Sequence, residues 1–328
     1  MRKKIRRTGV VKRRESGKEY EVQRVNLSYE KVVERISKVY ESEGYRHRTV
    51  RDYMSYWREF FEIIKKENVF DVTKEDFRRY ITTLLDVRKL SPVTVNIRLV
   101  SVKAIFSKLV KEELLSSNPG EEIPKLKIDE KKIYALSDSQ IKRLFSMVDT
   151  DSVAGYRDYC AMLTALYCGL RSNELNALEI EDVDFDNKVI LLPGAKNKNR
   201  KTRMIPMTEK VRNELHQLVT ENIENFGRDV KHVFVNSFGE SIRHDLIRKR
   251  MNMYGKKSGL DKEGVRCSPH SLRHSFAVRF LRGGGDIRTL QTIMGHSEIS
   301  TTQVYLRYTD EDLFDRYQEA SKRNPLDI

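Results

Sequence analysis

The spacing of apolar residues divides this chain more sharply than any other feature of its sequence. Between residues 28 and 117, apolar side chains recur at helical intervals, most clearly in the stripe Val50, Tyr53, Met54, Trp57, Phe60, Phe61 and Ile64. The periodicity stops in residues 119–133, which contain two prolines and end in a run of charges. Helical spacing then resumes near residue 136. The sequence therefore predicts two domains, the first of them entirely helical with the stripe as its core.

The second domain, 134–328, combines helices with a small amount of β structure. A helix predicted over about 154–168 is followed by two β-like runs, 189–192 and 203–206, on either side of a polar, lysine-rich turn. Residues 310–317 predict a short amphipathic tail helix. The predicted fold class is mainly α with a small antiparallel β-sheet.

Charge and cysteine usage narrow the function classes. The 62 Lys and Arg residues outnumber the 48 Asp and Glu residues, and a net charge of +14 favours a polyanionic partner such as nucleic acid. Residues 1–25 are rich in Lys and Arg and predict a basic arm. No apolar stretch approaches the roughly 20 residues of a membrane span. The three cysteines lack C-x-x-C spacing, which predicts a reduced, cytoplasmic protein without a disulfide framework.

Two blocks in the second domain carry residues suited to phosphodiester chemistry. Residues 169–175 read GLRSNEL, and residues 270–277 read HSLRHSFA. Each supplies one arginine, Arg171 and Arg273, whose planar guanidinium can give two parallel hydrogen bonds to a phosphate. Such preorganised donors stabilise the charge that develops on the phosphate during transfer.

A histidine and a tyrosine follow the second block. His296 lies in the sequence MGH (294–296), and Tyr305 comes nine positions later. A phenol can act as a nucleophile and store the energy of a broken phosphodiester in a covalent phosphotyrosine. Two arginines, His270, His296 and Tyr305 are therefore a residue set that could break a phosphodiester without a metal ion.

The second half of the chain resembles the catalytic domain of the tyrosine recombinases, the phage-integrase and Xer-like family. Four blocks match in order: GLRSNEL, the lysine-rich turn GAKNKNRK (194–201), HSLRHSFA, and the segment from Gly295-His296 to Tyr305. The resemblance implies a helical core-binding domain over 26–118, a linker over 119–133, and a catalytic domain from 134 onward.

The resemblance also implies roles for individual residues. Tyr305 would be the nucleophile, while Arg171 and Arg273 would bind the non-bridging oxygens. His270 would take the tyrosine-side proton or bind the phosphate, and His296 would donate to a non-bridging oxygen. His274 is expected to support its helix rather than to touch DNA.

A lysine in the hairpin turn would protonate the departing 5′-oxygen. The sequence A-K-N favours Lys196, whereas counting back from Pro206 favours Lys198. Glu174 and Asp182 are expected to orient Arg171 and Lys196.

Double-stranded DNA is the expected partner. Basic positions on the helical flanks of the first domain are the expected DNA contacts: Arg51, Arg58, Arg98 and Lys103. The resemblance implies four protomers on two sites, coupled through the C-terminal tail, and allows for an accessory DNA-bending or directionality protein. It implies no metal, no nucleotide cofactor and no membrane association.

Other functions compete with this interpretation. His270 and His274 lie at i, i+4 as in zinc hydrolases, but Ser271 stands where a metallopeptidase has glutamate. A DNA-binding protein without chemistry and a type IB topoisomerase also remain. Within the recombinases, the basic arm favours mobile-element integration and excision over chromosome-dimer resolution.

Overall fold

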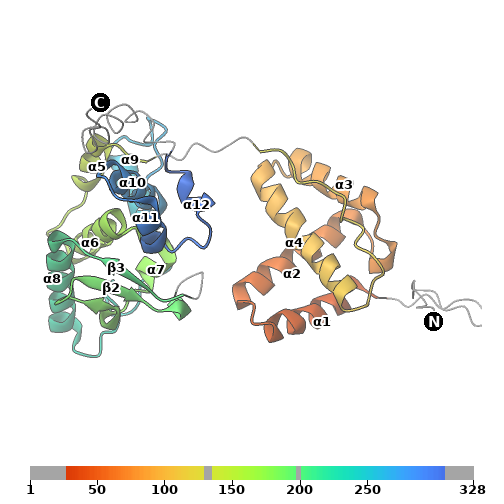
Figure 1. Ribbon diagram of the computed structural model, residues 1–328, viewed down its shortest axis with the longest axis horizontal. Helices are drawn as coiled ribbons and strands as arrows, with labels where there is room; N and C mark the ends of the chain where they lie inside the picture. Colours follow the sequence, from red (N-terminus) through yellow and green to blue (C-terminus); the bar gives the residue numbers. More distant parts are fainter. Residues whose placement is uncertain (1–26, 129–134, 197–200, 307–328) are drawn as a thin grey trace, which may run out of the picture. The chain divides into compact units, whose positions relative to one another are not determined.

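The computed structural model describes residues 27–128, 135–196 and 201–306 (Figure 1). The predicted basic arm and tail helix, together with Lys198, lie outside those residues. The chain divides between Lys131 and Lys132 into two compact units.

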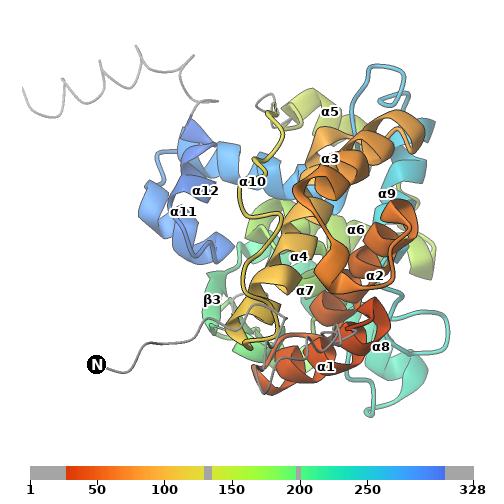
Figure 2. The same ribbon diagram turned by 90° about the vertical axis from the view of Figure 1, so that its right-hand side faces the viewer.

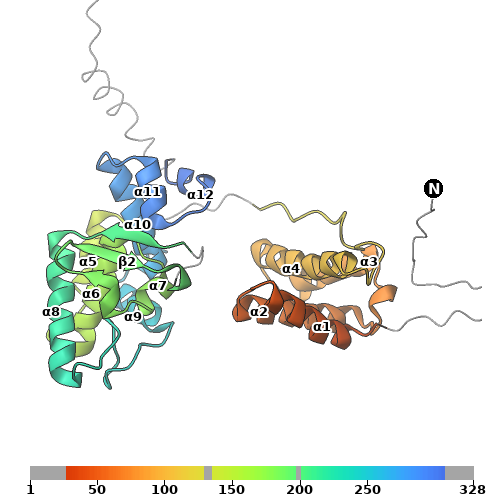
Figure 3. The same cartoon turned by 60° about the horizontal axis from the view of Figure 1, so that its bottom comes forward.

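The first unit consists of four α-helices with short irregular turns. They are α1 (Tyr29–Ser42), α2 (His47–Ile64), α3 (Lys74–Thr82) and α4 (Pro92–Lys111), with η1 (Val69–Asp71) before α3 and the π-helical turn η2 (Thr83–Val87) after it. Ser28 and Ser91 cap α1 and α4 through their side-chain oxygens, and Pro92 occupies the first turn of α4. Figure 3 shows α4 lying across α1 and α2.

The apolar stripe of α2 forms the core of this unit, as its spacing predicts. The Trp57 side chain is fully buried, with its ring centroid 4.9 Å from that of Phe106 on α4 and its indole nitrogen donating to the Tyr29 carbonyl. Phe60 and Phe77 fill the space beside it.

The first unit extends further along the chain than the sequence predicts. Ile123 is buried in its core, and the side-chain amide of Asn96 exchanges two hydrogen bonds with the backbone of Leu126. The segment that was expected to form the start of a linker therefore packs against α4, because these contacts satisfy its backbone and cover apolar surface.

The second unit has α-helices around a small sheet. Its helices are α5 (Asp138–Phe145), α6 (Val153–Cys168), α7 (Ser172–Asn176), α8 (Glu209–Phe226), α9 (Leu246–Lys257), α10 (Pro269–Arg282), α11 (Ile287–Met294) and α12 (Ser300–Gln303), with the 3-10 turns η3 (Ile180–Asp182) and η4 (Gly194–Lys196). Helix α6 is buried on nearly every side and packs against α8, α9 and α10, which explains why its sequence is apolar without a clear stripe. Figure 2 shows α11 and α12 beside α10.

The sheet is antiparallel with the strand order β1-β2-β3. The two strands expected from the sequence are present as β2 (Val189–Leu192) and β3 (Arg203–Pro206), and β1 (Val183–Asp184) adds a third that the sequence did not predict. In the register, Leu192 pairs with Arg203, which directs the Arg203 side chain inward beside the buried Ile205. These findings confirm a mainly helical fold with a small antiparallel sheet.

The three cysteines are buried, unpaired core residues. Burial raises the pKa of the Cys168 thiol to about 12. In the described part of the chain, no helix is both long and apolar enough to cross a membrane.

Truncation of the core ring beside Trp57 should destabilise the first unit selectively. Because Phe106 is fully buried, Phe106→Ala should lower the free energy of unfolding by about 3–5 kcal/mol. Trp57 is the only tryptophan in the chain, so its fluorescence during urea unfolding reports on this unit. The exposed variant Arg51→Ala is the control and should change stability by less than about 0.5 kcal/mol.

Candidate active site

Arg171 is positioned by a tight turn at the end of α6. Gly169 ends the helix in the left-handed region, with φ +63°, and a Cβ at this position would come within 2.4 Å of the Phe276 ring. Only glycine fits this turn, which places Arg171 at the start of α7. Its guanidinium donates to the carbonyl of Gly295 at 2.8 Å and to Glu174 Oε1 at 2.9 Å.

Glu174 lies between two guanidinium groups. Besides Arg171, it accepts two parallel hydrogen bonds from Arg203 on β3, at 3.0 and 2.7 Å. The carboxylate is only 2% exposed. Burial by itself would raise the pKa of Glu174, but the hydrogen bonds and charges of Arg203 and then Arg171 outweigh it and lower the pKa to about 2. Glu174 is therefore an ionised group bonded to both guanidiniums, and its role in orienting Arg171 stays a prediction.

Sequence reasoning missed Arg203. It is one cation in a run that also contains Arg200 and Lys201, and neither composition nor spacing distinguishes it. The only signal in the sequence was that Arg203 is the first residue of a predicted strand, whose alternate side chains face inward. The structure shows it buried, with Nε donating to the carbonyl of Ile293 at 2.9 Å.

Arg273 occupies the buried face of α10. Ser268 caps this helix, with Pro269 in its first turn, so the HSLRHSFA block begins at a fixed helical start. The Arg273 guanidinium donates to the carbonyls of Gly169 and Met294, the latter at 2.8 Å. Burial, followed by repulsion from Arg171, lowers the pKa of Arg273 to about 9, which still leaves it cationic at pH 7.

Three arginines thus converge on the carboxyl end of α11. Three consecutive carbonyls, those of Ile293, Met294 and Gly295, each accept from a different arginine, namely Arg203, Arg273 and Arg171. The last carbonyls of a helix have no partner within it and carry partial negative charge, so they attract cations. Gly295 ends α11 with φ +61°, and a Cβ there would lie 3.0 Å from Arg203.

The hydrogen bonds of His296 fix its tautomer. Its Nε2 lies 3.1 Å from Nη2 of Arg273, which can only donate, so Nε2 is an acceptor and the ring proton lies on Nδ1. Nδ1 in turn donates to Thr302 Oγ1 at 2.9 Å. Burial and the charge of Arg273 lower the pKa of His296 to about 4. In this state His296 orients Arg273, and donation to a phosphate oxygen would require a proton on Nε2.

Tyr305 lies beside His296 and His274. Its side chain is 3% exposed and its ring stacks on that of His296, with centroids 6.5 Å apart and planes within 9°. Its hydroxyl lies 2.8 Å from Nδ1 of His274. The sequence gave His274 a supporting role within its helix, and the structure adds a contact that the sequence did not identify, between its ring and the phenol.

His270 lies one helical turn before His274. It is exposed, and its ring makes an edge contact with that of His274 at a centroid separation of 4.1 Å. The covered part of the ring loses hydration even though the residue is exposed, and this loss and then the charges of Arg273, Arg266 and Arg171 lower the pKa of His270. Across residues 27–128, 135–196 and 201–306, no three His, Cys, Asp or Glu side chains gather as a metal site would require.

Lys196 is held by two carboxylates. Its ammonium donates to Glu179 at 2.6 Å and to both oxygens of Asp182 at 3.0 and 2.8 Å. Burial opposes the charged form, but these carboxylates outweigh it and raise the pKa of Lys196 above its ordinary value. Asp182 is thus one partner of Lys196, and Glu179 is a second partner that the sequence did not identify.

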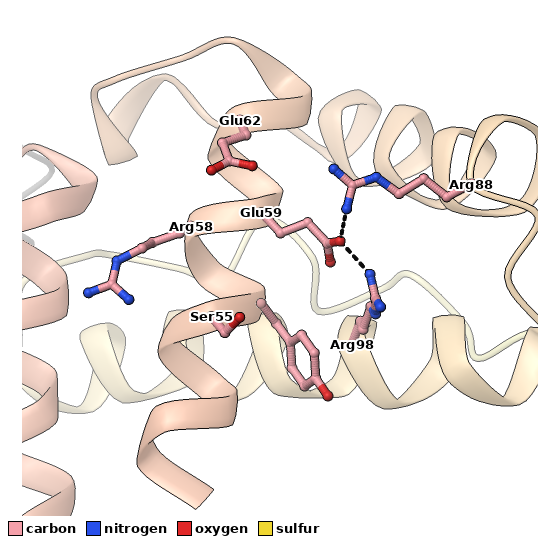
Figure 4. Close-up of a pocket in the computed structure, with 7 residues that line it drawn as sticks. Ser55, Arg58, Glu59, Glu62, Arg88 and Arg98 are labelled. Atoms are coloured by element: carbon pink, nitrogen blue, oxygen red, sulfur yellow. Dashed lines mark hydrogen bonds and ion pairs between the residues drawn. The ribbon is translucent and has the colours of Figure 1, made fainter. Parts of the chain in front are cut away.

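The cations predicted to contact DNA from the first unit differ in their surroundings. Arg51 and Arg58 are exposed on α2. Arg98 instead bonds to the Glu59 carboxylate, which also binds Arg88, and its guanidinium lies 5.4 Å from the centroid of the Tyr56 ring. These groups line a pocket of about 320 Å³. Figure 4 shows Arg58 pointing away from the two arginines that bind Glu59.

Lys103 also has partners within its own unit. Its ammonium donates to the carbonyls of Glu121 and Ile123, at 3.0 and 2.8 Å. It therefore fixes the segment after α4, and DNA contact by Lys103 and Arg98 stays a prediction.

Comparison with known proteins agrees with this geometry. Residues 135–312 match the phage integrase family, and residues 32–115 match the N-terminal SAM-like domain of phage integrases. The first match covers more than half of the chain. The chain belongs to the phage integrase family. Membership confirms the enzyme class predicted from the four blocks, a site-specific tyrosine recombinase.

Known proteins similar to this one match most of the chain. The tyrosine recombinase XerC of Chlamydia muridarum (strain MoPn / Nigg) is 31% identical over 235 residues, which are 71% of this chain and 72% of XerC. The Tn1549 transposon integrase, solved with circular intermediate DNA, has a TM-score of 0.68 at 22% identity, covering 88% of this chain and 100% of that one. A lambda integrase tetramer bound to a Holliday junction has a TM-score of 0.69 at 16% identity, covering 86% and 78%. At these identities the two structures show a shared fold.

The ion pairs of Glu174 should make the second unit sensitive to acid. Its folded pKa of about 2 lies below its ordinary value of 4.5, so its stabilisation is complete above pH 4.5 and is lost as the pH falls toward 2. Since one pKa unit corresponds to about 1.4 kcal/mol, the loss should be about 3 kcal/mol.

The matched variant is Glu174→Gln. Between pH 5 and pH 2, its free energy of unfolding, measured by urea titration with circular dichroism, should fall less steeply than that of the wild type. Glu224→Gln, on the exposed face of α8, should keep the wild-type slope. An unchanged slope in Glu174→Gln would contradict the assignment.

Proposed function

We propose that this recombinase cleaves and rejoins double-stranded DNA at specific sites through a 3′-phosphotyrosine formed by Tyr305. The observation that carries the proposal is the proximity of the Tyr305 ring to His296, which itself bonds to Arg273. Arg171 is held nearby, because its guanidinium donates to the Gly295 carbonyl at the carboxyl end of α11, next to His296 in the chain. A nucleophile thus lies beside the cations that its reaction needs.

The charge arrangement suits phosphoryl transfer. Negative charge grows on the non-bridging oxygens as a fifth oxygen approaches phosphorus, and Arg171 and Arg273 would stabilise it in a site of low hydration. Their existing bonds to carbonyls and to Glu174 hold the guanidiniums before substrate arrives. The covalent phosphotyrosine conserves the energy of the broken bond, so no nucleotide is required.

The partners follow from the same chemistry and from the relatives. DNA-bound neighbours of the same fold support double-stranded DNA as the substrate, and the lambda integrase tetramer supports four protomers exchanging strands through a Holliday junction. We propose Arg51 and Arg58 as phosphate contacts of the first unit, and the cytoplasm, where DNA is accessible, as the compartment.

The biological task has two candidates. The basic arm, residues 1–25, favours integration and excision of a mobile element, as does the resemblance in fold to transposon and phage integrases. The XerC relatives weakly favour chromosome-dimer resolution. We retain mobile-element recombination as the proposal, with an accessory DNA-bending protein and coupling of protomers through the C-terminal tail.

Two contacts lead us to propose Lys198 in place of Lys196 as the general acid. A useful acid has a pKa near the working pH, whereas Glu179 and Asp182 raise that of Lys196 and occupy its donors. Lys198, two residues further along the turn, lies outside the described residues and was the alternative open from the sequence.

Replacement of the phenol should separate binding from chemistry. Tyr305→Phe should form no covalent adduct on a nicked suicide substrate but should bind that DNA with nearly wild-type affinity. Tyr308→Phe is the matched control and should form adduct normally. A covalent adduct in Tyr305→Phe would refute the proposed nucleophile.

The two lysines can be separated by changing the leaving group. Loss of a general acid typically slows a reaction about 10²–10⁴-fold. Lys198→Ala should show such a loss on normal DNA and recover on DNA with a sulfur in place of the bridging 5′-oxygen, because a thiolate leaves without a proton. Single-turnover cleavage is the measurement. If the cleavage rate of Lys196→Ala, and not that of Lys198→Ala, recovered on the sulfur-containing DNA, Lys196 would be the general acid.

A further inference from the structure

We infer that His274, and not the neighbouring His270, accepts the phenolic proton of Tyr305 when the phenol attacks DNA. The inference rests on the proposed function, in that it takes Tyr305 as the nucleophile. It adds a catalytic role to a residue that the sequence treated as part of the helix scaffold.

Geometry is the first argument. A proton acceptor must lie within hydrogen-bonding distance of the proton it removes, and His274 Nδ1 is 2.8 Å from the Tyr305 hydroxyl. The other described neighbours serve this role less well. His296 uses both ring nitrogens on Arg273 and Thr302, and the ring contact of His270 is with His274.

Burial is the second argument. With Tyr305 3% exposed, bulk water has little access to its hydroxyl, so the proton must pass to a side chain in contact with it. His274 is itself partly buried, while His270, one turn earlier on α10, is exposed. The order Tyr305, His274, His270 therefore runs from the buried phenol to the surface.

The charge state of His274 fits an acceptor. Burial, followed by repulsion from His270, Arg273 and His296, lowers the pKa of His274 to about 3, so the ring is neutral at pH 7 and can accept a proton. A bound phosphate would offset the charge of Arg273 and raise the proton affinity of His274 when it is needed.

The step balances without another reactant. The Tyr305 oxygen forms a bond to phosphorus while the bond from phosphorus to the 5′-oxygen breaks. The phenolic proton moves to His274 Nδ1, and the hairpin lysine gives a proton to the 5′-oxygen. In rejoining, a 5′-hydroxyl gives its proton to the hairpin lysine and displaces the phenol, and His274 returns the proton to the phenolic oxygen.

The test uses His274→Asn in the full-length protein. The Asn side chain can keep a hydrogen-bonding group near the position of Nδ1 but is not basic enough to take the proton. If His274 is the acceptor, single-turnover adduct formation on the suicide substrate should slow about 10²–10⁴-fold while DNA binding persists. A merely structural hydrogen bond would leave the rate of His274→Asn near that of the wild type and would overturn the inference.

A second measurement identifies the step that is impaired. Site-specific replacement of Tyr305 by 3,5-difluorotyrosine makes the phenol more acidic and should restore much of the rate lost in His274→Asn. His270→Asn is the matched control and should show no comparable rescue. Rescue in His270→Asn but not in His274→Asn would assign the proton to His270.

An isosteric analogue covers the case in which His274→Asn does not fold. Site-specific 1,2,4-triazole-3-alanine at position 274 keeps the ring shape with a lower basicity, and it should slow cleavage. Introducing 3,5-difluorotyrosine at position 305 should restore much of the rate lost with the analogue at 274, whereas the analogue at 270 should show no such restoration. A rate unaffected by the analogue at 274 would overturn the inference. Failure of the proposed function is a separate result, since it would appear as a covalent adduct in Tyr305→Phe.

Discussion

The carboxyl end of α11 presents three consecutive carbonyls, and the placement of the active-site cations depends on them. Arg203, Arg273 and Arg171 each donate to one of these carbonyls, and Glu174 lies between Arg171 and Arg203. Three guanidinium groups at such short separations would repel one another strongly in a poorly hydrated site. The helix end and the buried carboxylate offset that repulsion, so the cations are held in place before any phosphate arrives.

This arrangement joins segments that are distant in sequence. Helix α6 runs through the centre of the unit and ends at Gly169, whose carbonyl accepts from Arg273, while the turn that follows presents Arg171. Helix α10 packs along α6 and brings His274 toward Tyr305. The core packing of two helices thus fixes the positions of the catalytic groups. The same packing sets which of their side chains are neutral and which are charged. His296 is neutral beside Arg273, and Glu174 is ionised although it is buried.

Much of this could be predicted from the sequence. Apolar periodicity located α2, a continuous apolar run located α6, Ser91-Pro92 located the start of α4, and two short β-like runs around a polar turn located β2 and β3. The resemblance of four blocks identified the family. Contacts within the blocks were harder to predict. Arg203 could not be told from other cations of its turn, and Arg98 and Lys103 were indistinguishable from solvated flanks until Glu59 and two backbone carbonyls were found beside them.

The sequence by itself determined the elements, the family and the residue types available for chemistry, because helical and strand periodicity and short motifs are local properties of a chain. Only the tertiary structure decided which of those residues meet. That Lys196 is bound by Glu179 and Asp182, and that the Tyr305 phenol faces His274, depends on how separate elements pack against one another. The strength of each hydrogen bond and the position of each proton depend on burial and on neighbouring charges, and neither is encoded in the spacing of a motif.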